Sequence, residues 1–165
     1  MPGLRPSLNN TDYAAGATRL EAYLYRYIPL VRHMQVRVAG FDATGLTLTA
    51  PLAANINHQS TAFGGSLVSL ATLACWGLTW LLLEQEHGTH IVISESHILY
   101  LRPVTEALVA NCTLPDEPLL ENFFVTLKRR HKARLELKAH ILQGKILCAR
   151  FTGTCVAYRE NRPSA

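Results

Sequence analysis

The sequence predicts an α+β fold in which an antiparallel β-sheet wraps around one long apolar helix. The segment from Leu67 to Leu83 is apolar almost all round, so a helix there needs cover on every side. On both sides of this segment, apolar and polar side chains alternate, as they do in half-buried strands. A sheet that curls around the helix satisfies both patterns.

A helix and a hairpin precede the long helix. Leu20 and Leu24 lie at helical spacing and predict a helix over Thr18–Tyr27, which Pro29 ends. The alternation within residues 34–38 and 46–50 predicts two strands, and the Asp42–Gly45 turn joins them into a hairpin. Residues 55–61 are polar and irregular, which predicts a loop that leads into the long helix, opened by two glycines and ended near residue 84.

The second half of the chain is mostly strand. Residues 91–104 and 107–114 are β-rich and are separated by Pro103 and a turn. Alternation over 134–141, a turn at Gln143-Gly144 and a β-rich run over 145–158 predict two more strands. Leu119, Phe123 and Leu127 share helical spacing, so a short helix interrupts the strands.

Length and composition indicate one reduced, cytoplasmic domain. The 165 residues fit a single domain over 1–165, with a core over about residues 27–158, and 48% hydrophobic residues exclude general disorder. The four cysteines form no CxxC pair or Cys/His cluster, so no metal site is expected. Residues 1–12 lack an export signal's pattern, and the apolar segment is slightly short for a membrane span.

A basic run accounts for much of the net charge of +4. Five cations fall within seven residues: Lys128, Arg129, Arg130, Lys132 and Arg134. Such a run is most often a solvated helix end. No aromatic interleaving or nucleic-acid motif accompanies it, so we expect no nucleic-acid partner. The phosphates of a small cofactor or an acidic carrier protein remain possible partners.

The stretch from Asn55 to Ser66 carries the chemistry. Gly64 and Gly65 stand where the long helix begins, and glycines there let another backbone or a ligand approach closely. The unpaired N–H groups at a helix start form a site for developing negative charge. An equally good interpretation is that the glycines allow tight packing while the asparagines cap a turn.

The residues from Asn57 to Cys75, with the flanking strands, resemble the hot-dog-fold thioesterases that act on coenzyme A or acyl-carrier-protein thioesters. In the phenylacetate-pathway type, an Asn precedes a His-Gly-Gly that opens the central helix, and an acidic residue follows two turns later. Here Asn57 takes the Asn position, Phe63-Gly64-Gly65 the His-Gly-Gly, and Thr72 the acidic position. Leu101-Arg102-Pro103 also resembles the end of the superfamily's next strand.

This chain departs from that motif twice, with Phe63 in place of the His and Thr72 in place of the acidic residue. The departures argue against hydrolysis, which needs a carboxylate to attack or to activate water. Helical spacing places Gly65, Ser69, Thr72 and Trp76 on one side of the helix. The site would therefore be lined by two hydroxyls and one indole. Such a neutral pocket suits the decarboxylation of a malonyl thioester, in which hydrogen-bond donors stabilise an enolate oxygen and no base is required. The wider pattern, with Asn55, Thr61 and Ala74-Cys75-Trp76-Gly77, is similar to a putative thioesterase family, some members of which decarboxylate malonyl-acyl carrier protein.

The resemblance implies roles for individual residues. Gly65 with Asn57 or Asn55 would hold the enolate oxygen, and Thr72, Ser69 or a water would place the carboxylate and supply the proton. The substrate-binding residues would be Thr61, Phe63, Gly64, Ser66, Ser69 and Ser96, and the carrier-docking residues Arg129, Arg130, Lys132 and Arg134. The family also implies a homodimer, and no cofactor beyond the phosphopantetheine of the carrier or of coenzyme A.

Two other functions remain open at this point. A thioesterase would need a carboxylate from Glu95, paired with His97 on the same strand face, or from a neighbouring chain. A non-catalytic dimeric module would bind acyl thioesters without turnover. We expect His58 to be solvated, and Trp76 and Trp80 to lie in the core or an interface.

Overall fold

The structure, a computed structural model, describes residues 10–84, 86 and 88–159. The export-signal prediction concerns residues 1–12, most of which lie outside the described residues. The elements are α1 (Asn10–Tyr27), α2 (Pro29–Met34), β1 (Arg37–Asp42), β2 (Gly45–Ala50), η1 (Leu52–Ala54), α3 (Gly64–Leu82), β3 (Thr89–Tyr100), β4 (Leu108–Thr113), α4 (Glu117–Arg130), β5 (Lys132–Gln143) and β6 (Ile146–Arg159).

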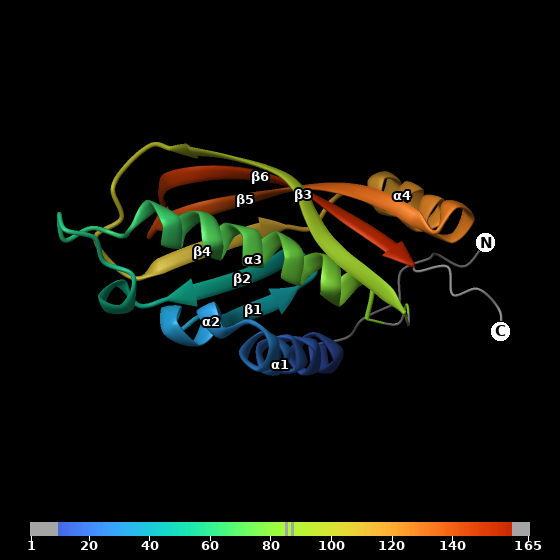
Figure 1. The fold of residues 1–165 in the computed structure, drawn as a ribbon, viewed down its shortest axis with the longest axis horizontal. Helices are drawn as coiled ribbons and strands as arrows, with labels where there is room; N and C mark the ends of the chain where they lie inside the picture. Colours follow the sequence, from blue (N-terminus) through green and yellow to red (C-terminus); the bar gives the residue numbers. More distant parts are fainter. Residues whose placement is uncertain (1–9, 85, 87, 160–165) are drawn as a thin grey trace.

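The strands of the described residues form one antiparallel sheet in the order β1-β2-β4-β5-β6-β3. The sheet curves around α3, which lies in its hollow (Figure 1). The predicted α+β class and the sheet wrapped around a central apolar helix are therefore confirmed, and the arrangement is that of the hot-dog fold.

Two N-terminal boundaries differ from the prediction. Helix α1 begins at Asn10 rather than Thr18, because its first turns pack on the rest of the domain. Gly16 lies against the side chains of Leu81 and Phe41, and the Tyr13 ring meets Phe41 edge-on at 5.0 Å. Pro29 ends α1 as predicted but also opens α2, since proline fits the first position of a helix. Strand β1 consequently starts at Arg37, three residues later than the alternation predicts.

Strands β3 and β4 are adjacent in sequence but distant in the sheet. Strand β4 lies between β2 and β5, whereas β3 pairs only with β6 at one edge. Strand β3 ends at Tyr100, before the predicted residue 104, because the N–H groups of both Leu101 and Arg102 turn to the single carbonyl of Cys148. The chain then passes the segment that leads into α3, where the Ala62 N–H donates to the Val104 carbonyl at 2.8 Å, and reaches β4 (Figure 1).

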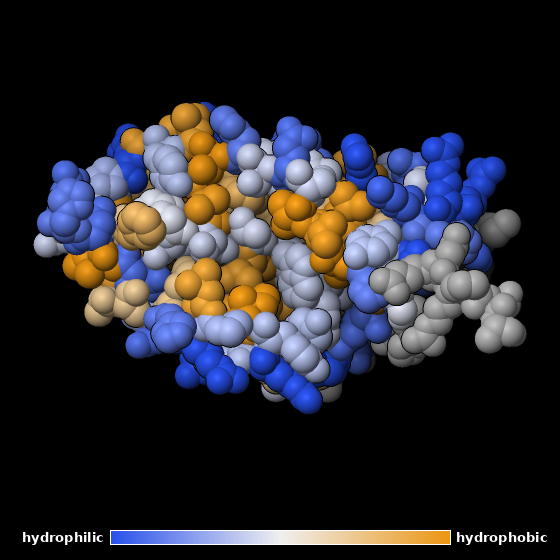
Figure 2. Space-filling model, in the orientation of Figure 1, coloured by the Kyte–Doolittle hydropathy of each residue, from blue (hydrophilic) through white to orange (hydrophobic). Residues whose placement is uncertain are grey.

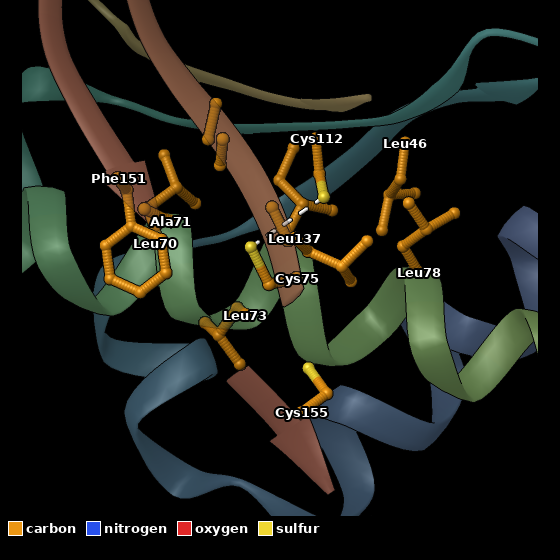
Figure 3. Close-up of a cluster of buried hydrophobic side chains, with 14 of the residues drawn as sticks. Leu46, Leu70, Ala71, Leu73, Cys75, Leu78, Cys112, Leu137, Phe151 and Cys155 are labelled. Carbon is orange, nitrogen blue, oxygen red and sulfur yellow. Dashed lines mark hydrogen bonds between the residues drawn. The ribbon is translucent and has the colours of Figure 1, made fainter. Parts of the chain in front are cut away.

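The core is built around the buried side of α3. Cys75 of α3 and Cys112 of β4 place their sulfur atoms 3.7 Å apart among leucines and Phe151 (Figure 3). The contact with Cys112, together with burial, raises the pKa of the Cys75 thiol, and burial raises the pKa of Cys155 to about 12. These thiols pack as small apolar side chains.

Helix α3 has the length and composition of a membrane span, but more than half of it is buried inside the domain. Its apolar character is explained by its place in the core.

The two edges of the sheet are treated differently. Helix α1 covers the β1 edge, and the Glu21 carboxylate accepts a hydrogen bond from the Val38 N–H at 2.8 Å. No described element covers the β3 edge, which exposes Val92 and Leu99. An unpaired strand with exposed apolar side chains invites pairing with another strand.

Candidate active site

The loop over residues 55–63 is closed by its own backbone. The Phe63 N–H donates to the Asn55 carbonyl at 2.7 Å, and the Asn57 N–H donates to the Thr61 carbonyl at 2.8 Å. Ile56 and Ala62 form a bridge inside this closure. The ends of the loop are thereby held together, and the chain enters α3 at a fixed angle.

The Asn57 side chain organises the interior of this loop. Its Oδ1 accepts from the N–H groups of Gln59 at 2.8 Å and Thr61 at 3.1 Å. Its Nδ2 donates to Thr61 Oγ1 at 2.9 Å and lies 3.4 Å from the Ala62 carbonyl. The second contact is long, so the Nδ2 hydrogen that points to the Ala62 carbonyl is only weakly hydrogen-bonded.

Asn55 anchors the loop to the rest of the domain. It is 3% exposed, and its Nδ2 donates to the carbonyls of Met34 at 2.9 Å and Pro51 at 2.8 Å. Both amide hydrogens are thus used on the main chain, while Oδ1 is buried with no hydrogen-bond partner among the described residues. Direct substrate contact by Asn55 stays a prediction, and the geometry gives this residue a positioning role.

The N-terminus of α3 presents free donors. Among the hydrogen bonds of the described residues, none involves the N–H of Gly64 or of Gly65, and the N-cap residue Phe63 supplies no side-chain cap. The Phe63 ring, 57% exposed, lies over Gly65, where an added Cβ would come within 2.2 Å of it. Two backbone donors therefore lie beside one apolar ring.

Tyr100 at the end of β3 closes the other side of this mouth. Its hydroxyl donates to the Gly64 carbonyl at 3.0 Å. Tyr100 was not predicted as a site residue, although it directly precedes Leu101-Arg102-Pro103, the segment that resembles the superfamily. That resemblance alone could have drawn attention to it.

The predicted stripe on α3 is partly exposed, as a pocket lining requires. Ser69 donates to the Gly65 carbonyl at 2.7 Å, so its hydroxyl hydrogen is engaged within the helix. The Trp76 indole donates to the Ile91 carbonyl at 3.1 Å, which ties α3 to β3 and closes the stripe. No hydrogen bond among the described residues involves the Thr72 hydroxyl, which is available to a ligand or water.

Trp76 and Trp80 belong to an aromatic cluster at the end of the stripe. The Tyr23 ring of α1 lies 5.8 Å from Trp76 and 5.2 Å from Trp80, centroid to centroid. The cluster fixes α1 against α3.

A bulge in β3 decides which of its polar side chains face α3. The register shifts between Ile93 and Glu95, so that Ser96 lies opposite Gly153, next to the pair of Ile98 and buried Phe151. Residues that alternate along a strand point to opposite faces, which places Ser96 on the α3 face. Glu95 and His97 face the other way, opposite Thr154 and Thr152. The predicted acid/base pair of Glu95 and His97 is therefore wrong for this chain's own site.

The remaining predicted residues are distributed as follows. His58 is exposed in the loop, as expected, and Ser66 lies in the first turn of α3 with its side chain partly exposed. Arg129, Arg130, Lys132 and Arg134 lie at the end of α4 and the start of β5. In Figure 1, α4 lies beyond the C-terminal end of α3, away from the α3 N-terminus. Within the described part of the chain, no group of three or more His, Cys, Asp and Glu side chains is placed to hold a metal.

Comparison with known proteins identifies the family. Residues 17–159 match the model of the family described as putative thioesterase (yiiD_Cterm). The chain belongs to this family. The match spans every element described here except the first turns of α1.

Solved structures agree with this assignment. A putative thioesterase from Shewanella oneidensis is 34% identical, with a TM-score of 0.79, over 88% of this chain and 99% of that one. A protein of unknown function from Chlorobaculum tepidum is 32% identical, with a TM-score of 0.82, over 87% and 94%. The PaaI protein from the phenylacetic acid degradation operon of E. coli, 18% identical with a TM-score of 0.62 over 90% and 96%, shares the fold.

Proposed function

We propose that this family member decarboxylates a malonyl thioester, carried on an acidic acyl carrier protein, at the N-terminus of α3. One observation carries the proposal. The mouth offers free N–H groups on Gly64 and Gly65 and a free hydroxyl on Thr72, while α3 contains no Asp or Glu and Glu95 faces away. These groups stabilise negative charge, and none of them is a base that could activate water.

The reaction balances with these groups. The bond between the carboxylate carbon and the methylene carbon breaks, carbon dioxide leaves, and the electron pair moves into the thioester carbonyl to give an enolate. The N–H groups of Gly64 and Gly65 donate to the enolate oxygen, and one such donor lowers the barrier by about 3–4 kcal/mol. The methylene carbon then takes one proton from Thr72 or a water that it holds, and solvent replaces that proton.

The other predicted residues support these groups. Asn57 and Thr61 keep the loop closed, and Asn55 fastens it to α2, so that the glycine donors keep their direction. The proposal retains the weakly engaged N–H of Asn57 as a further donor. Ser66, Ser69 and Ser96 border the substrate, and Phe63 covers its thioester.

The direct test is the identity of the product. Malonyl-acyl carrier protein incubated with the protein should lose one carbon dioxide while its thioester bond survives, which mass spectrometry of the intact carrier detects. Free carrier thiol together with malonate would overturn the proposal.

The Thr72 hydroxyl gives a second prediction. Thr72→Val keeps the shape of the side chain but removes the hydroxyl, and decarboxylation should fall by about 10²-fold if this group delivers the proton. The rate of carbon dioxide release measures the effect. Thr79→Val is the matched control, because Thr79 is buried on the same helix with its hydroxyl bonded to the Cys75 carbonyl at 3.0 Å. An equal loss of rate in both variants would mean that Thr72 contributes to packing and does not deliver the proton.

Thioester hydrolysis is the second candidate, favoured by the family's description as a thioesterase. It would need a carboxylate that this chain's α3 does not supply, and a second copy is the available source. Coenzyme A thioesters would then be substrates alongside carrier thioesters. We further propose a cytoplasmic homodimer that pairs through the open β3 edge, since the other edge is blocked by α1 and Glu21.

A further inference from the structure

The basic residues and the candidate active site lie at opposite ends of one chain. Helix α3 runs from the mouth toward α4, and its 19 residues span ~28 Å at 1.5 Å per residue. In Figure 1 the N-terminus of α3 lies at one end of the molecule and α4 lies beyond the other end of α3. A carrier bound at α4 would have to pass its thioester along the whole helix to reach the site of the same chain.

The surface at α4 has the features of a docking site. Two adjoining grooves of about 530 and 510 Å³ lie between α4 and β5 and share Asn122 and Arg134. Arg130, Lys132 and Lys138 line them as well, so that four cations, counting Arg134, outnumber the one lining carboxylate, Glu136. Leu119 adds an apolar side chain that is 55% exposed. No ion pair among the described residues engages these cations. Figure 2 shows hydrophilic side chains crowded at this end of the molecule.

This combination fits an acidic, amphipathic segment. Unpaired cations on the walls attract acidic side chains and speed encounter, and the exposed leucine offers contact to an apolar residue. A carrier with an acidic helix meets both requirements. We name these residues the basic groove: Asn122, Arg130, Lys132, Arg134, Lys138 and Leu119.

Symmetry decides which site the groove serves. Two copies that pair through the same edge strand about a two-fold axis must run antiparallel. Pairing at β3 therefore turns the second copy end for end, and its α4 lies at the same end of the dimer as the first copy's α3 N-terminus. The basic groove of each chain then approaches the active site of its partner.

We propose that the carrier docks in trans, so that the basic groove of one protomer presents the thioester to the α3 N-terminus of the other. This inference rests on the proposed function for its substrate. It rests on the open β3 edge for its geometry.

Heterodimers of two differently tagged chains test it. The groove variant is Arg130→Glu with Arg134→Glu, and the site variant is Gly64→Pro. When the groove variant is on one chain and the site variant on the other, the intact site faces an intact partner groove, so about half of the wild-type rate should remain. When both variants are on one chain beside a wild-type chain, the intact site faces the altered groove, and the carrier-linked rate should fall roughly tenfold or more.

The opposite pattern would establish docking in cis, and equal rates in the two heterodimers, or failure of the chain to dimerise, would also overturn the proposal. Arg26→Glu on α1 is the control for charge reversal, because Arg26 is exposed and lies outside the groove. Circular dichroism checks folding. If the wild type releases thiol instead of carbon dioxide, the proposed function fails. The rate of thiol release in the same two heterodimers then tests docking in trans separately.

Discussion

Gly64→Pro is expected to lower the rate of decarboxylation by about 10²–10³-fold while the fold is retained. Proline removes only the Gly64 N–H, one of the two backbone donors assigned to the enolate oxygen. Gly64 is the first residue of α3, the position at which a helix accepts proline best. The preceding Phe63 is already extended, with φ −64° and ψ 131°, as a residue before proline must be.

Gly64→Ala is the matched control for this substitution. An alanine Cβ would lie 3.5 Å from the Tyr100 hydroxyl, an ordinary contact, and the N–H would remain. Steady-state rates and thermal melting of the two variants separate chemistry from folding. If alanine and proline reduce the rate equally, or if proline has no effect, the Gly64 N–H is not a donor to the reacting oxygen.

Asn55→Asp is expected to cost about 3 kcal/mol or more of the free energy of unfolding at neutral pH. The new side chain has the same shape, but it cannot donate to both the Met34 and Pro51 carbonyls, and a buried carboxylate beside two carbonyl oxygens is repelled. Burial raises the pKa of such a carboxyl in the folded state above its value of ~3.9 in the unfolded chain. The variant therefore binds protons more tightly when folded.

The sign of the pH dependence follows from that pKa. The variant should be most stable below the unfolded pKa and lose stability as pH rises through the raised folded pKa, by about 1.4 kcal/mol per pH unit in between. Urea unfolding at several pH values measures this. Asn57→Asp is the control, because Asn57 keeps its two acceptor bonds from Gln59 and Thr61 after the change. Equal losses in the two variants, or no pH dependence, would remove the anchoring role of Asn55.

Periodicity was sufficient to predict the central helix and the sheet around it. Helix α3 and the alternating β5 are determined by local pattern, because each buries a face that can be read from residue spacing. The place of β3 at the sheet edge, apart from β4, could not be predicted, since strand order depends on contacts between distant residues. The bulge beside Ser94, which fixes the direction of Glu95, also has no local signal.

The candidate site was predicted in its residues more than in its contacts. The two glycines and Thr72 could be chosen because helix starts and helical spacing have fixed geometry. The partners of Asn55 could not, because Met34 is 21 residues away in sequence. The basic run was recognised from charge alone, but only the fold shows that it lies beyond the far end of α3.

Simultaneous measurement of carbon dioxide and free thiol released from one malonyl thioester tests the central claim most directly. Because the mouth of α3 offers donors to an enolate oxygen and α3 itself contains no Asp or Glu, we predict that carbon dioxide appears with the decay of substrate while thiol stays at the background level. Gly64→Pro should suppress that carbon dioxide release. Thiol released in step with substrate decay, with the acetyl thioester absent, would contradict the account.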